Sequence, residues 1–148
     1  MPSSSRSGRG AGWVIAQFAL MAVILVLGVF RPIWPDLVRI AGFPLILGGV
    51  VFGIWSGRAL GVSLTPYPRP KEDATLVQSG PYGLVRHPIY VAGLLVFLGY
   101  GFLASVPATA AVALLAALWH FKAVVEERHL AGRFPEYADY RRRVRSGV

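Results

Sequence analysis

The chain has 148 residues, of which 55% are hydrophobic and 15% are charged, with a formal net charge of +8. This length allows one domain, the apolar composition excludes an ordinary soluble fold, and the lack of cysteine excludes disulfides and thiolate chemistry. In a membrane protein, excess Lys and Arg marks cytoplasmic loops and contact with anionic lipid, so the charge predicts membrane lipids rather than nucleic acid as partners.

Two apolar spans are predicted in the first third of the chain. Residues 1–12 are small, polar and basic, and we expect them to be disordered. Residues 13–30 form an uncharged run that is long enough to cross a hydrocarbon core of ~30 Å. The run ends in a Pro-rich turn rather than a small-residue cleavage site, which favours an uncleaved span over a signal peptide. Residues 37–57 make the second span.

Four glycines recur every four residues in the second span and just beyond it: Gly49, Gly53, Gly57 and Gly61. On a helix they share one face and form a smooth ridge that another helix can approach closely. The pattern predicts helix packing, either within the chain or between two copies in a homodimer.

The remaining chain alternates between one long polar segment and one long apolar segment. Residues 58–87 are rich in proline and charge and are predicted to form a loop. Residues 88–125 carry no charge before Lys122 and break at Ser105, Val106 and Pro107, which predicts a tight helical hairpin whose helices pack through Gly93, Gly99 and Gly101. Residues 126–148 hold an acidic motif and a basic helix.

The distribution of charge predicts the topology. Thirteen of the 15 Lys and Arg residues lie in the N-terminus, the 58–87 loop and the C-terminal segment counted from Lys122 onward, so the positive-inside rule places both termini and the loop in the cytoplasm, at a bacterial inner membrane. In the C-terminal helix Tyr137, Tyr140 and Val144 share a face opposite the arginines, which is typical of a helix on the membrane surface. The predicted fold is an all-α integral membrane protein of about four transmembrane helices plus an interfacial helix.

The densest group of chemically capable side chains lies in the stretch GPYGLVRHPIY, residues 80–90. Pro88 suits the first turn of a helix, so Arg86 and His87 are expected at a helix N-terminus, which favours an anionic group. Tyr82 and Tyr90 offer flat faces and hydroxyls to an aromatic ligand. An equally open interpretation is that Arg86, His87 and Tyr90 are interfacial residues of a membrane helix.

A second group lies where the hairpin ends. Two adjacent carboxylates, Glu126 and Glu127, are costly at a membrane interface unless water, a cation or a ligand compensates them. Lys122 precedes Glu126 by one helical turn, and the simplest interpretation is an i,i+4 ion pair. The three histidines of the chain have no clustered acids beside them, so no metal site is predicted.

Taken together, GPYGLVRHPIY, a helical hairpin, EERHL and FPEYADYRRRV resemble the isoprenylcysteine carboxyl methyltransferase family and the related phospholipid N-methyltransferases over roughly residues 74–144. The resemblance implies a membrane enzyme that uses S-adenosylmethionine to methylate a lipophilic acceptor, either an isoprenylcysteine-type carboxylate or a lipid headgroup. It also implies that the cofactor is enclosed by Ala74, Thr75, Leu76, Val77, Tyr82, His87, Pro88, Ile89, Tyr90 and Glu126. Lys122 stands where the family often has a substrate-binding arginine, so a planar bidentate donor is missing.

The candidate catalytic residues are Arg86, Lys122, Glu126 and Glu127. A carboxylate acceptor needs no base and would be held by Lys122 or Arg86, whereas an amine needs a base, for which Glu126 or Glu127 is the first choice. Two alternatives remain open on the sequence. One is an NADPH-dependent sterol or steroid reductase with a similar C-terminal region, and the other is a non-catalytic membrane accessory protein.

Overall fold

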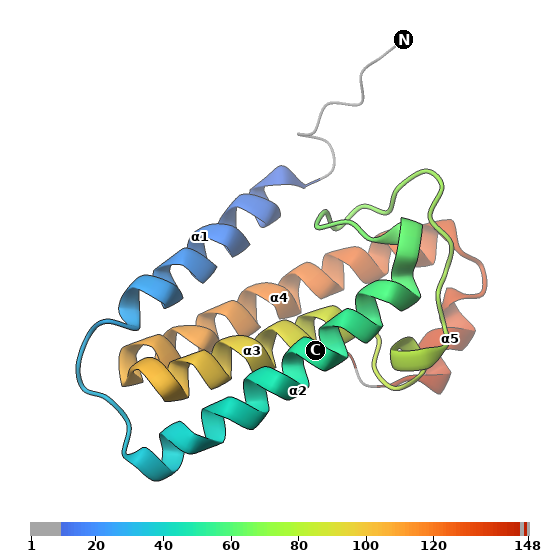
Figure 1. Ribbon diagram of the computed structural model, residues 1–148. Helices are drawn as coiled ribbons and strands as arrows, with labels where there is room; N and C mark the ends of the chain where they lie inside the picture. Colours follow the sequence, from blue (N-terminus) through green and yellow to red (C-terminus); the bar gives the residue numbers. More distant parts are fainter. Residues whose placement is uncertain (1–9, 146, 148) are drawn as a thin grey trace.

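The computed structural model describes residues 10–145 and 147, and within them every regular element is helical (Figure 1). This confirms the all-α prediction. The elements are α1 (Ala11–Leu27), α2 (Asp36–Leu60), α3 (Pro88–Ala104), α4 (Val106–Arg133) and α5 (Tyr137–Arg143), with 3-10 turns at Gly61–Ser63 and Gly80–Gly83. Of the N-terminal segment expected to be disordered, residues 1–9 lie outside the described part, and Ala11 and Gly12 are helical.

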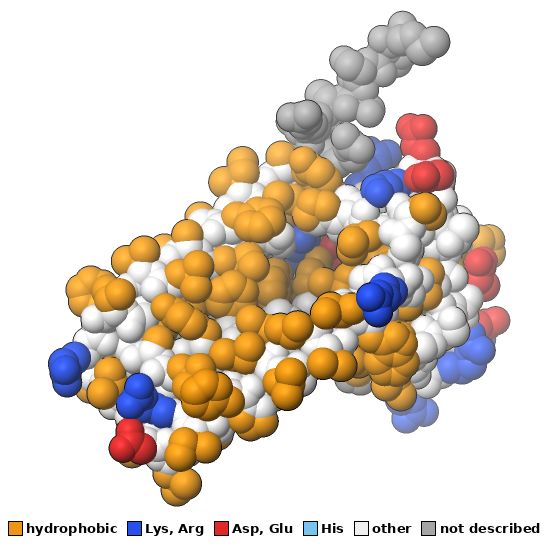
Figure 2. Space-filling view, viewed as in Figure 1, with side chains coloured by type: hydrophobic (Ala, Val, Ile, Leu, Met, Phe, Trp, Pro, Cys, Tyr) orange, Lys and Arg blue, Asp and Glu red, His pale blue; other side chains and the backbone are white. Residues whose placement is uncertain are grey.

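Two helices are long and apolar enough to cross a membrane: α2 with the turn after it, Asp36–Ser63, and α4. The helices α1 and α3 are apolar but have 17 residues each, one fewer than the 18 taken as the minimum for a span. Two of the four predicted spans are therefore long enough in the structure. Only 11% of the most apolar window of α2 is buried. Apolar side chains cover the face of the molecule along α1 and α2 (Figure 2). Such exposure is too costly in water and indicates a membrane protein.

The helices pack in the order α1, α4, α3, α2 across the bundle (Figure 1). The hairpin of α3 and α4 lies in the middle, and the two N-terminal helices flank it. Its turn is the single residue Ser105, whose hydroxyl caps α4 by accepting from the Ala108 N–H at 3.1 Å and donates to the Leu27 carbonyl at 2.7 Å. Because α4 runs on to Arg133, the acidic motif lies within a helix rather than after it.

Glycines bring α2 and α3 into close contact. A Cβ at Gly49 would lie 2.7 Å from the Ala92 carbonyl oxygen, and one at Gly99 would lie 2.6 Å from the Gly42 carbonyl oxygen. Gly99 therefore faces α2, and the expectation that it packs against α4 is wrong, because the two helices of the hairpin meet at Gly93 and Gly101 instead. Part of the glycine ridge is thus used inside the chain, whereas Gly57 and Gly61 have no such neighbour within 4 Å.

This packing predicts opposite effects of two similar substitutions in α2. Gly49→Ala should destabilise the protein by about 2 kcal/mol, since the new methyl group meets backbone atoms that cannot move aside. Gly57→Ala should be neutral or stabilise by up to about 1 kcal/mol, because it removes backbone entropy and meets nothing. Thermal unfolding in detergent compares the two variants, and equal midpoints would contradict the assignment of Gly49 to the seam between α2 and α3.

The apolar face of α5 is covered by the protein itself. Tyr137, Tyr140 and Val144 are buried and pack against Leu76, Leu130 and Phe134. The prediction that this face lies on the membrane surface is therefore wrong. The end of α4 and the segment before α3 come close enough to bury it, which the local sequence pattern of α5 does not reveal. The arginines of the helix remain exposed on its other side.

Candidate active site

A cavity of about 510 Å³ lies at one end of the bundle, between α1, the segment that follows α2, the start of α3 and the end of α4. Figure 2 shows the hollow beside α1, with a basic side chain visible inside it. This volume is typical of a site for a small organic ligand. The site residues predicted from the sequence that line the cavity are Ala74, Thr75, Leu76, Val77, Tyr82, Arg86, His87, Ile89, Tyr90, Lys122 and Glu126.

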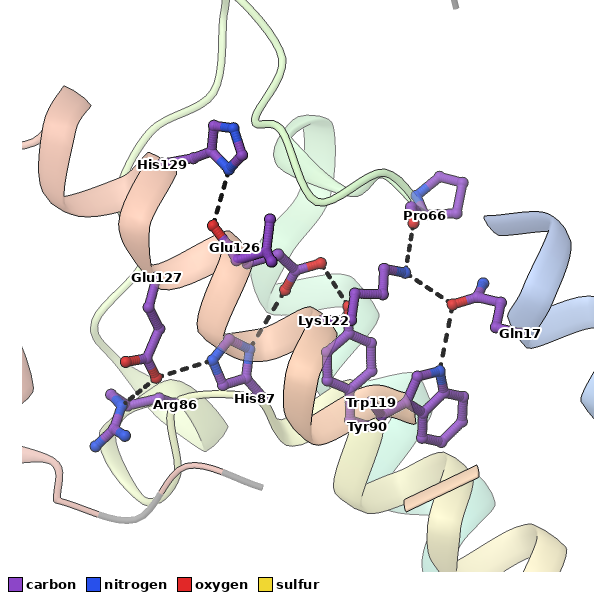
Figure 3. A network of polar contacts seen from close by, with 11 residues as sticks. Gln17, Pro66, Arg86, His87, Tyr90, Trp119, Lys122, Glu126, Glu127 and His129 are labelled. Atoms are coloured by element: carbon purple, nitrogen blue, oxygen red, sulfur yellow. Dashed lines mark hydrogen bonds and ion pairs between the residues drawn. The ribbon is translucent and has the colours of Figure 1, made fainter. Parts of the chain in front are cut away.

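Two predicted site residues do not line the cavity. Pro88 is buried as the first residue of α3, where its missing N–H and fixed φ suit the helix start. Glu127 points away from the cavity towards Arg86 (Figure 3). The other predicted site residues come from elements far apart in the chain and meet at the cavity.

Glu126 is held in place by the first turn of α3. The Tyr90 hydroxyl donates to Glu126 Oε1, and His87 Nδ1 lies 3.5 Å from Glu126 Oε2 (Figure 3). The rings of His87, Tyr90 and Trp119 stack in series, with centroid separations of 5.6 and 5.2 Å. Gly93 leaves room for the last ring, since a Cβ there would lie 2.5 Å from it. The carboxylate therefore has one defined orientation at the cavity wall.

Arg86 ties the C-terminal segment to the site. Its Nε donates to Glu127 Oε1 at 2.7 Å, and its Nη1 donates to the carbonyls of Val144 and Arg145 at 2.7 and 2.6 Å. The sequence predicts that the Arg86 guanidinium helps to hold a ligand anion. In the structure its hydrogen bonds are made to the protein instead, so it is not poised for that role. Glu127 in turn compensates Arg86 instead of facing the reaction space.

His87 bridges the two acidic residues. Its Nε2 contacts Glu127 Oε1 at 3.1 Å, opposite its contact with Glu126. Burial lowers the pKa of His87, but the contacts with Glu126 and Glu127 outweigh burial and hold that pKa above its usual value. The charged imidazolium, which donates from both nitrogens, is thereby favoured.

Lys122 is 1% exposed and does not form the expected pair with Glu126. Its Nζ donates to Gln17 Oε1 at 2.7 Å and to the Pro66 carbonyl at 2.6 Å (Figure 3). The same Gln17 oxygen accepts from Trp119 Nε1 at 3.2 Å. Gln17 was missed in the sequence, although an amide in the middle of an apolar helix is costly in a membrane and is itself a signal of function.

Tyr137 was also missed, because the sequence assigned it to a membrane-facing surface. It is 2% exposed, it lines the cavity, and its buried hydroxyl has no hydrogen-bond partner among the described residues. Burial raises the pKa of Tyr137, so the hydroxyl stays a neutral donor. The neighbouring Tyr140 hydroxyl, in contrast, donates to the Tyr82 carbonyl at 2.7 Å. Since buried polar groups are nearly always paired, the unpaired Tyr137 hydroxyl is an exception among the side chains at the cavity.

The cavity thus carries a negative and a positive group. The Glu126 carboxylate lies between His87 on one side and the Lys122 ammonium, towards α1, on the other (Figure 3). Aromatic and apolar side chains form most of the remaining wall. Such an arrangement suits a ligand, or a pair of ligands, that carries both charges and a flat ring.

Comparison with known proteins adds a family. The sequence model for the phospholipid methyltransferase family matches residues 37–137. The cobalt-zinc-cadmium resistance protein CzcN of Cupriavidus metallidurans is 45% identical over 94 residues, which cover 57% of this chain and 44% of that protein. The nickel-cobalt-cadmium resistance protein NccN of Alcaligenes xylosoxydans xylosoxydans is 39% identical over 75 residues, which cover 49% of this chain and 35% of that protein. The matched region spans less than half the length of either relative.

Proposed function

The chain belongs to the phospholipid methyltransferase family, and on this premise we propose that it is a membrane enzyme that uses S-adenosylmethionine to methylate a lipophilic acceptor in the cavity. One observation carries the proposal. A carboxylate, a buried ammonium and an unpartnered buried hydroxyl, those of Glu126, Lys122 and Tyr137, line one cavity with largely aromatic and apolar walls.

The residues present fit the cofactor. S-adenosylmethionine carries an ammonium, a sulfonium, a carboxylate and an adenine ring. Glu126 would hold a positive group, and the Tyr137 hydroxyl would donate to the carboxylate. Tyr82 and the apolar segment 74–77 would enclose the adenine. The segment is held in place by Ser63, whose hydroxyl accepts from the Thr75 N–H at 3.1 Å.

When bound, the cofactor would supply a methyl group that is activated by the sulfonium. The task of the protein is then to orient the two reactants and exclude water, which supplies up to ~7–11 kcal/mol in well-aligned reactions. Glu126 is oriented by Tyr90 and His87, and the Lys122 ammonium lies on the other side of it. A carboxylate acceptor would pair with Lys122. For an amine, Glu126 is the carboxylate at the cavity wall that would take the proton, since Glu127 is engaged elsewhere.

The topology is part of the proposal. With the N-terminus, the 58–87 segment and the C-terminal segment in the cytoplasm, as the positive charges indicate, the cavity end of the bundle lies on the cytoplasmic side. The acceptor would then reach the cavity from the bilayer. A reporter that is active only outside the cytoplasm should be inactive when it is fused to the C-terminus. Activity of this fusion would contradict the orientation.

The experiment that tests the function is calorimetric titration of S-adenosylmethionine and S-adenosylhomocysteine into detergent-purified protein. We expect saturable binding of both. If well-folded protein bound neither of them, the proposal would be wrong, and NADPH would be the next ligand to titrate.

Replacing Tyr137 separates binding from stability. Tyr137→Phe removes a hydroxyl that has no hydrogen-bond partner among the described residues, so the free energy of unfolding should be unchanged or higher by up to about 1 kcal/mol. Affinity for S-adenosylhomocysteine should fall about tenfold, since a donor to a charged group is lost. Calorimetry and thermal unfolding of the same samples measure the two effects.

Tyr140→Phe is the matched control on the same helix. It breaks a buried hydrogen bond to the Tyr82 carbonyl and should therefore cost about 1 kcal/mol of stability with little change in affinity. Identical behaviour of the two variants would remove Tyr137 from the site.

A further inference from the structure

The helix α1 lies before the region that matches the family, 37–137, yet it contributes a polar side chain to the cavity. Gln17 is 7% exposed and is the one amide in a helix that has no hydroxyl or charged side chain. An amide in such surroundings is retained only if its hydrogen bonds are satisfied or it serves a ligand. Its carbonyl oxygen accepts from both Lys122 and Trp119.

These bonds keep Lys122 away from Glu126. A lysine and a glutamate four residues apart on a helix ordinarily reach each other. Here Lys122 Nζ makes no ion pair with Glu126, because it donates to Gln17 Oε1 and to the Pro66 carbonyl instead. The third hydrogen of the ammonium has no hydrogen-bond acceptor among the described residues, and Nζ lies 5.3 Å from the centre of the Tyr90 ring.

Both partners of the ammonium are uncharged carbonyl groups. They solvate the charge, and Glu126 attracts it only across the cavity, without a direct ion pair, so the ammonium keeps one donor that no described residue accepts. Burying a charge without a direct ion pair is costly, and an anion that pairs with it lowers the cost. Phe18 and Leu64, which also line the cavity, are 55% and 46% exposed, so exposed apolar side chains form part of the cavity wall.

We propose that Gln17 is a positioning residue that keeps Lys122 available as the anion site for the methyl acceptor, so that the cavity selects amphiphiles with a carboxylate head over those with an amine or alcohol head. The inference rests on the proposed function, because it names the acceptor class of the same site. It assigns a role to a helix that lies outside the family match.

The transfer is balanced for such an acceptor. A carboxylate oxygen forms the bond to the methyl carbon while the carbon–sulfur bond breaks, and sulfur keeps the electron pair. A carboxylate and a sulfonium become an ester and a thioether, and no proton is transferred. The neutral ester no longer pairs with Lys122, which favours its release.

The test measures head-group preference by calorimetry with chain-matched palmitate, hexadecylamine and hexadecanol, with and without S-adenosylhomocysteine, after subtraction of empty-micelle controls. Wild-type protein should bind palmitate about tenfold more tightly than hexadecanol, since an ion pair replaces a neutral hydrogen bond. Hexadecylamine should bind no better than the alcohol.

Gln17→Glu is the decisive variant. It can accept the same two hydrogen bonds but neutralises Lys122, so the preference for palmitate should disappear while the fold is kept. Gln17→Met removes the acceptor and should also weaken palmitate binding, because the ammonium can then turn to Glu126. Ile15→Leu, a substitution at an exposed position on α1, is the control and should leave the preference for palmitate unchanged.

The outcomes separate the two proposals. Wild-type protein without a carboxylate preference, or a Gln17→Glu variant that retains it, would overturn the role of Gln17 even where S-adenosylhomocysteine binds. Failure of S-adenosylhomocysteine to bind would count against the proposed function, while the palmitate titration without it still decides the anion site.

Discussion

Glu126→Gln is expected to lower the affinity for S-adenosylmethionine by about tenfold to a hundredfold without unfolding the protein. The substitution removes the negative charge at the cavity wall but keeps an oxygen that can accept from the Tyr90 hydroxyl. The loss is therefore electrostatic rather than structural, and calorimetric titration beside thermal unfolding measures both quantities.

The same variant locates the positive group that Glu126 holds. S-adenosylhomocysteine lacks the sulfonium charge but keeps the amino group. A larger loss for S-adenosylmethionine than for S-adenosylhomocysteine would place Glu126 beside the sulfonium, and equal losses would place it beside the amino group. Glu72→Gln, at an exposed position, serves as the control and should bind like wild type. Unchanged binding by Glu126→Gln would exclude the residue from the cofactor site.

Arg86→Leu is expected to destabilise the protein by about 3 kcal/mol, because it leaves the Glu127 carboxylate partly buried without its closest cation. The side chains of Arg86 and Glu127 are 12% and 13% exposed, so water compensates little of the loss. The carbonyls of Val144 and Arg145 lose their donor as well. Thermal unfolding reports the stability, and limited trypsin digestion reports release of the C-terminal segment.

Two further variants make this prediction specific. Arg142→Ala removes an arginine of α5 whose side chain is 77% exposed and should change stability by no more than about 0.5 kcal/mol. The double variant Arg86→Leu with Glu127→Leu removes both charges and should recover part of the stability lost in Arg86→Leu. If the double variant were less stable than the single one, the cost would lie in packing and not in the unpaired charge.

Several features of the fold were predictable because they depend on neighbours in the chain. Pro88 starts α3 where a residue without an N–H is tolerated, and the helical hairpin breaks at Ser105, a good N-cap. The uncharged runs likewise predicted the helices of an apolar bundle. These signals act within one or two helical turns and survive whatever the rest of the chain does.

The candidate site was predictable in part. Tyr82, His87 and Tyr90 belong to one motif and Glu126 to a second, and the hairpin brings the two motifs to one end of the bundle. They line one cavity together with residues 74–77 and Lys122. The roles expected for Arg86 and Glu127 differ from what their contacts show, because each compensates the other. A motif identifies charged residues, but their nearest partners depend on the distance and direction of side chains from other elements.

The sequence by itself determined the helical class, the apolar character of α2 and α4 and the meeting of the two motifs, since each follows from local composition and from a short hairpin connection. Only the tertiary structure decided that Gln17 holds Lys122 away from Glu126, that Arg86 anchors the C-terminal segment, and that Tyr137 lines the cavity with a buried hydroxyl that has no hydrogen-bond partner among the described residues. Each of these depends on the packing of elements distant in the chain. Burial and the supply of partners, rather than residue type, decide whether a polar group is satisfied or left for a ligand.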